Sequence, residues 1–170
     1  IGGSSFGVIS PPKARVLLLT PSLKGISDGV NRIAPSLGLM LMAPQLIKSG
    51  HIVKIHDVAL EGWNDKKKIQ SINKDPINKV VLIGQSEEEI ANVIANFSPD
   101  IICISVLYSN LIESAHTIAK IAKQTNKNIN VILGGNHISN VLIDYKFAIT
   151  DINSNLPKNI KDLDDENIDL

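Results

Sequence analysis

Four short, predominantly apolar stretches recur along the chain, separated by longer segments that mix polar and apolar residues. They are Arg15–Thr20, Ile52–Asp57, residues 101–106 and residues 129–133. Apolar runs of this length are typical of strands that are buried on both faces, as in parallel sheets. We therefore expect these four segments to form strands of one parallel sheet.

A first helix is predicted over residues 36–49, where apolar residues recur with helical spacing. Ser36 suits its N-cap, and Gly50 suits the turn that ends it. Pro44 lies inside the segment, so we expect a kink or an unpaired carbonyl there.

Two further helices are predicted over residues 87–96 and 111–123, the first of them opened by the capping-box pattern of Ser86 and Glu89. Strands and helices thus alternate along the chain. This alternation predicts an α/β fold with a doubly wound parallel sheet, Rossmann-like or flavodoxin-like. In such sheets ligands bind beyond the carboxyl ends of the strands.

Other segments are less regular, and they set the expected boundaries of the domain. Residues 1–13 are rich in Gly, Ser and Pro and form a lead-in to a domain over residues 14–150. Residues 21–35 are expected to be a long loop, and residues 147–150 a fifth strand. Residues 151–170 are acidic and indicate a solvated linker or tail.

The composition of the chain argues against several classes of binding partner. The 17 basic and 17 acidic side chains cancel, and aromatic residues make up only 4%, so neither a nucleic acid nor another polyanion is indicated. No apolar run approaches the roughly 18–20 residues that span a bilayer, so no membrane partner is expected. The single cysteine, Cys103, forms no internal disulfide, zinc site or cysteine-ligated cluster, which favours a cytoplasmic location.

A three-part pattern lies at the ends of the expected strands. Its parts are Asp57 through Gly62, then Ser105 and Leu107, then Gly134 with Gly135. In composition and spacing the pattern resembles the cobalamin-binding signature, D-x-H-x-x-G followed by S-x-L and G-G.

A second set of residues narrows the resemblance. Pro35 through Leu39, Gly50 through Asp57, Pro99-Asp100 and Gly134-Gly135-x-His137 look like the amino-terminal cobalamin-binding domain of radical S-adenosylmethionine enzymes. Most of those enzymes are methyltransferases that act on unactivated carbon or phosphorus, and an anaerobic ring cyclase is a relative.

This resemblance implies a slot along the sheet for the dimethylbenzimidazole tail of cobalamin. Gly134 and Gly135 lack a Cβ and leave the slot open. Ser105 is placed to hydrogen-bond a ring nitrogen of the tail, and Leu107 to form an apolar wall. Tyr108, which follows, is a candidate contact beneath the corrin ring.

One departure from the signature concerns the metal. Ala59 stands where related groups carry the histidine that coordinates cobalt, and a methyl group is no ligand. We therefore expect a base-off cofactor without histidine ligation. Asp57, which would otherwise support that histidine, loses its relay role and is left to cap a loop. Gly62 completes this part of the cofactor site.

The resemblance implies a cofactor domain within a larger activity. S-adenosylmethionine and a 4Fe–4S cluster would belong to a radical SAM domain in cis or in trans, because that cluster needs three cysteines and this chain has one. On this interpretation the chain binds cobalamin and performs no radical chemistry alone.

Two alternatives remain open. A flavodoxin-like regulatory or binding module without cobalamin would make Ser105, Leu107 and the paired glycines ordinary strand-end and turn residues. A stand-alone corrinoid carrier is the second alternative, and Ala59 counts against it. Among the histidines, His56 is expected to be a packed or surface residue rather than a ligand. His137 is expected either to shape the tail pocket or to make a hydrogen bond within its loop.

Overall fold

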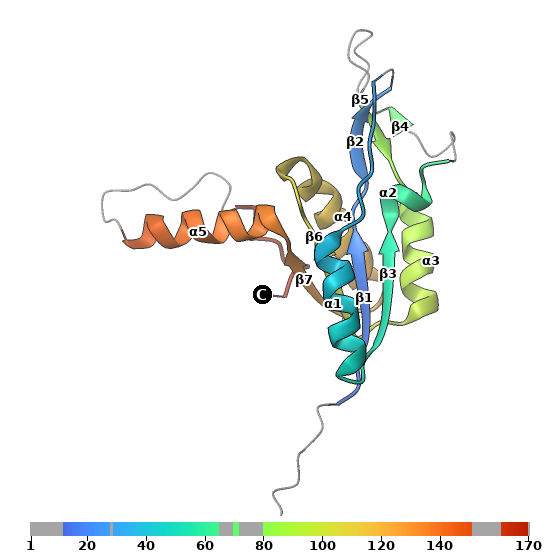
Figure 1. The fold of residues 1–170 in the computed structure, drawn as a ribbon, viewed down its shortest axis with the longest axis vertical. Helices are drawn as coiled ribbons and strands as arrows, with labels where there is room; N and C mark the ends of the chain where they lie inside the picture. The colour runs from blue at the N-terminus through green and yellow to red at the C-terminus, as the bar shows by residue number, and fades with distance from the viewer. Residues whose placement is uncertain (1–11, 28, 65–69, 72–79, 151–160, 170) are drawn as a thin grey trace, which may run out of the picture.

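The computed structural model describes residues 12–27, 29–64, 70–71, 80–150 and 161–169. Its centre is a four-stranded, fully parallel sheet with the order β3-β1-β6-β7 (Figure 1). The strands are β1 (Arg15–Thr20), β3 (Ile52–Asp57), β6 (Ile101–Ser105) and β7 (Asn130–Gly134). All four predicted strands are confirmed, with ends that differ by at most one residue.

Helices cover both faces of this sheet, as the doubly wound prediction requires (Figure 1). The helices are α1 (Leu37–Lys48), α2 (Val58–Glu61), α3 (Glu87–Phe97), α4 (Ile112–Thr125) and α5 (Asn136–Thr150), with a 3₁₀ turn, η2 (Ser109–Leu111). The predicted capping box is confirmed at α3, where the Ser86 hydroxyl accepts from the Glu89 amide at 3.3 Å. Gly50 ends α1 with a φ of +91°.

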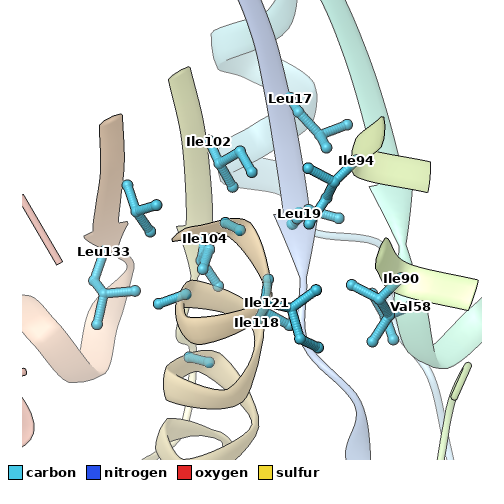
Figure 2. Close-up of a cluster of buried hydrophobic side chains, with 14 of the residues drawn as sticks. Leu17, Leu19, Val58, Ile90, Ile94, Ile102, Ile104, Ile118, Ile121 and Leu133 are labelled. Atoms are coloured by element: carbon cyan, nitrogen blue, oxygen red, sulfur yellow. The ribbon is translucent and has the colours of Figure 1, made fainter. Parts of the chain in front are cut away.

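The larger part of the core lies between the sheet and the pair α3 and α4 (Figure 2). Alternate strand residues point into it, among them Leu17, Leu19 and Ile104, all at most 1% exposed. They meet Ile94 and Ile118 from the helices. Successive strand residues point to opposite faces of a sheet, so Leu17 and Leu19 face this core while the residues between them face the other side.

The other face of the sheet is only partly covered. Val16 and Leu18 pack there against α1. Farther along, Cys103 and Ser105 of β6 lie in register beside Ile132 and Gly134 of β7. Figure 1 shows α5 projecting away from the sheet, and Ile132 is 43% exposed. We call these four residues of β6 and β7 the open face.

A small antiparallel sheet corrects the expected loop over residues 21–35. There, β2 (Leu23–Ile26) pairs with β5 (Val80–Ile83), which also pairs with β4 (Gln70–Ser71). The pairing partner of β2 lies far along the chain. No local turn signal announces such a pairing, and Gly25 weakened the strand pattern.

Two further expectations are wrong near the C-terminus. Residues 147–150 belong to α5 rather than to a fifth strand, because the helical spacing of buried Ile138 and Val141 carries the helix onward. The acidic end is not wholly solvated, since Asp162 is only 9% exposed. Most of the predicted lead-in lies outside the described residues.

Among the described helices, none combines the length and apolar character that crossing a lipid bilayer requires.

Candidate functional site

A pocket of about 230 Å³ lies at the carboxyl ends of β1, β3 and β6. The chain leaves β1 for β3 on one side and reaches β6 on the other, so the strand order reverses here. Open α/β sheets bind their ligands at this kind of switch point. The lining residues are Thr20, Pro21, Leu23, Arg32, Ile33, Ala34, Ser36, Asp57, Ala59, Ser105, Leu107, Tyr108 and Leu111.

Thr20, the last residue of β1, presents an unsatisfied group in this pocket. Its hydroxyl oxygen is buried and has no hydrogen-bond partner within the described part of the chain. A buried, unpaired hydroxyl costs about 1–3 kcal/mol, which a ligand with a hydrogen-bonding group recovers. Sequence reasoning named Thr20 only as a strand end, although that position, beside the switch point, was the available signal.

Ser105 and Ser36 form a hydroxyl pair across the pocket. The Ser36 hydroxyl donates to the Ser105 hydroxyl oxygen, and the two oxygens are 3.3 Å apart. The proton of the Ser105 hydroxyl therefore stays available for another acceptor. Ser36 occupies the N-cap position of α1, but its side chain does not cap the helix, because the hydroxyl is turned toward Ser105.

The paired glycines have different surroundings. A Cβ built on Gly134 meets nothing within 4 Å, so the space above this residue is open. Gly135 has a φ of +100°, and its Cβ would lie 2.7 Å from the Val106 carbonyl oxygen. Gly134 thus borders an empty strip of the open face, whereas Gly135 is required by the turn itself.

Val106 joins the second and third parts of the motif. Its amide donates to the carbonyl oxygen of Gly134 at 2.7 Å, and its own carbonyl accepts from the His137 amide at 3.1 Å. The residues on either side of Val106 are Ser105 and Leu107, so the glycine turn fixes both at the pocket.

The first part of the motif divides into lining and packing residues. Asp57 lines the pocket and caps α2, because its Oδ1 accepts from the Leu60 amide at 3.0 Å. Ala59 also lines the pocket and is 5% exposed. Gly62 does not line it: a Cβ there would lie 2.1 Å from the carbonyl carbon of Gly84. Gly62 therefore allows a close approach of two backbones.

Apolar side chains form the mouth of the pocket. Leu107 is 44% exposed and Tyr108 is 61% exposed, although both line the cavity. An adjoining cavity of about 270 Å³ shares Thr20 and Asp57 and extends along Met40 toward β3. Large apolar side chains left exposed around a cavity favour an apolar ligand surface.

The histidines lie elsewhere. His56 is buried and contacts the Gln85 side chain, as its predicted packing role requires. His137 pairs with Asp162, and its Nε2 lies 2.9 Å from Oδ2. No described histidine lines either cavity.

On the open face, burial raises the pKa of the Cys103 thiol, so this thiol remains protonated at neutral pH.

Two curated proteins are similar to this chain in sequence. It is 32% identical over 123 residues to cytidylyl-2-hydroxyethylphosphonate methyltransferase of Streptomyces wedmorensis, across 72% of this chain and 22% of that protein. It is 31% identical over 124 residues to an uncharacterized methyltransferase of Pyrococcus horikoshii, across 73% of this chain and 22% of that protein. The chain therefore spans about a fifth of the length of these relatives.

A solved structure and a family model are also similar to this chain. The crystal structure of a cobalamin-binding protein from Desulfitobacterium hafniense aligns with a TM-score of 0.44 and 14% identity, covering 73% of this chain and 45% of that one. Residues 24–151 match the model of the B12 binding domain. Because this match covers most of the sequence, the chain belongs to the B12 binding domain family.

Proposed function

We propose that this chain binds cobalamin in a base-off state, with no protein histidine on the cobalt, as the cofactor domain of a cobalamin-dependent radical S-adenosylmethionine methyltransferase. The nucleotide tail would enter the open face between β6 and β7. The corrin ring would lie over the pocket at the carboxyl ends of the strands.

The observation that carries the proposal is the pairing of Ser105 with Gly134. They are direct neighbours in adjacent parallel strands, and open space lies above the glycine. A flat aromatic tail fits such a strip, since it needs an apolar path and one hydrogen bond for its ring nitrogen. Ser105 has the free proton for that bond, and Ile132 supplies exposed apolar surface.

Other pocket residues suit the remainder of the cofactor. The unpaired Thr20 hydroxyl supplies a hydrogen-bonding group for one of the polar amide arms around the corrin. Leu107 and Tyr108 offer exposed apolar surface at the mouth, against which a large ring can pack.

The absence of a protein ligand on cobalt rests on Ala59. It lines the pocket, its methyl group cannot coordinate a metal, and its neighbour Asp57 uses its carboxylate to cap α2. Bound cobalamin would supply a cobalt centre able to carry a methyl group, and the residues lining this pocket would position it.

The wider enzyme is inferred from the relatives. Both curated relatives carry the name methyltransferase and are far longer than this chain. In the proposed enzyme, S-adenosylmethionine and a 4Fe–4S cluster lie in a separate radical SAM domain, in cis or in trans. The coding sequence around this chain tests that part: a Cys-x-x-x-Cys-x-x-Cys motif in the same frame or a neighbouring gene supports it, and no such motif in either place contradicts it.

Cofactor binding is tested by titrating the chain with hydroxocobalamin and removing unbound corrinoid by gel filtration. The expected result is a retained corrin spectrum. After reduction to Co(II), its electron paramagnetic resonance signal should lack nitrogen superhyperfine splitting. A protein that elutes without corrin would instead support a flavodoxin-like module without this cofactor.

A gain-of-ligand variant sharpens the test. Ala59→His introduces an imidazole at the pocket and should add nitrogen splitting to the Co(II) signal. Lys54→His, at an exposed position on β3, is the matched control and should leave the signal unchanged. Nitrogen splitting in the unmodified protein would contradict the proposed base-off, histidine-free state.

A further inference from the structure

The acidic C-terminal segment, residues 161–169, is fastened to the domain at several points. The Asp162 carboxylate pairs with His137 at the start of α5, and its backbone carbonyl accepts from His116 Nε2 of α4 at 3.0 Å. Asp165 lies 3.5 Å from His116 Nδ1. These three contacts join the segment to two different helices, α4 and α5.

The other end of the segment is held along β7. Asp169 Oδ2 accepts from the Val131 amide at 2.8 Å and from Lys123 Nζ at 2.6 Å. The Asp169 amide donates to the Val131 carbonyl at 2.7 Å. The segment therefore runs beside β7 and α4 and is fixed at both ends.

One of these contacts, the Asp162–His137 pair, lies beside the glycine turn in sequence. Both side chains are largely buried, at 13% and 10% exposure, so water competes little with the contact between them. His137 is two residues after Gly135, and its amide donates to the Val106 carbonyl. The Asp162 contact therefore helps to fix the position of His137, and through its amide hydrogen bond the position of Val106, which lies between Ser105 and Leu107.

We propose that residues 161–169 act as a clasp that holds the Gly134–Gly135 turn against Val106, with Asp162 as the positioning residue for the tail slot. This inference rests on the proposed function and deepens it. It makes the affinity for the nucleotide tail depend on a segment that does not line the pocket, and it links the C-terminal end of the chain to cofactor binding.

The test compares Asp162→Ala with Asp164→Ala. Asp164 lies in the same segment, is exposed, and its side chain makes no hydrogen bond or ion pair with a described residue, so its variant removes an equal charge without opening the clasp. Dissociation constants are measured for cobalamin and for cobinamide, which lacks the nucleotide tail. We expect Asp162→Ala to weaken cobalamin binding at least fivefold and to leave cobinamide binding unchanged, while Asp164→Ala changes neither.

A second measurement needs no ligand. Amide hydrogen exchange at Val106 and His137 should be faster in Asp162→Ala than in the unmodified chain and in Asp164→Ala. Equal exchange in the two variants overturns the clasp, as does an equal loss of cobalamin and cobinamide affinity. If the unmodified chain binds no cobalamin, the proposed function fails, and the exchange rates still decide whether the clasp holds the turn.

Should Asp162→Ala fail to fold, Asp162→Leu replaces it, because leucine fills a similar volume but cannot accept a hydrogen bond from His137. The same two measurements and the same expected differences apply to this variant.

Discussion

A β-carbon at Gly135 would lie 2.7 Å from the carbonyl oxygen of Val106, and the φ of Gly135 is +100°. Both facts exclude an ordinary side chain from this turn. We predict that Gly135→Ala destabilises the fold by about 1–3 kcal/mol, measured by urea denaturation. Gly38→Ala is the control: its Cβ meets nothing within 4 Å, and in a helix it should stabilise by about 0.5–1 kcal/mol. A neutral Gly135→Ala would show that the turn relaxes freely.

Gly134→Leu is predicted to separate binding from folding. A Cβ at Gly134 meets nothing within 4 Å, so the start of a side chain fits there, and the free energy of unfolding should change by no more than about 0.5 kcal/mol. The leucine should occupy the strip assigned to the nucleotide tail and abolish cobalamin binding. Lys54→Leu, an exposed strand position elsewhere in the sheet, is the control and should bind normally. Unchanged affinity in Gly134→Leu would place the tail elsewhere.

The hydroxyl pair predicts a graded loss of affinity. Ser105→Ala removes the donor offered to the tail, at a cost of about 0.5–1.5 kcal/mol, or roughly twofold to thirteenfold in Kd for cobalamin. Ser36→Ala leaves that donor in place but frees its orientation, so its effect should be smaller. Because the two hydroxyls are in contact, the double variant should lose less than the sum of the single effects. Additive losses would mean that Ser36 acts independently.

The Lys123–Asp169 pair predicts a pH dependence of stability. A hydrogen bond from Lys123 and one from the Val131 amide lower the pKa of Asp169 below its ordinary 3.8. A lowered pKa means that the folded state binds this proton less readily than the unfolded state. The stabilisation is therefore present at neutral pH and is lost as the pH falls through the folded pKa, below 3.8.

The measurement is the urea midpoint of the unmodified chain and of Asp169→Asn at several pH values. The unmodified chain should be slightly more stable than Asp169→Asn at pH 7. This difference in urea midpoint should become smaller below pH 3.8. The gap should also shrink in high salt, since the Asp169 side chain is 45% exposed. A gap that widens toward acid would contradict the assignment.

The parallel sheet could be predicted from the sequence because its signal is local. A strand such as Arg15–Thr20 is apolar at every inward position, and Ser86 and Glu89 carry their capping pattern within four residues. The small antiparallel sheet could not be predicted in this way. The sequence of β2 is typical of a loop, and its pairing with β5, far along the chain, depends on the whole fold.

The candidate site shows the same division. Motif spacing led to Ser105 and Gly134, which the structure places side by side. Thr20 and Ser36 carry no motif, and they become visible only as an unpaired buried oxygen and as a hydroxyl contact between distant segments. Gly62 belongs to the motif, yet its surroundings are another glycine's backbone, which spacing alone does not reveal.

The hydrogen bonds between Asp169 and Val131 also affect whether another strand can add to this sheet. β7 is a border strand, and such strands recruit a neighbouring chain through their free backbone groups. Asp169 already engages both the amide and the carbonyl of Val131, so an incoming strand finds no partner there. At Val131, this border of the sheet is therefore closed to an added strand, whether in assembly or in aggregation.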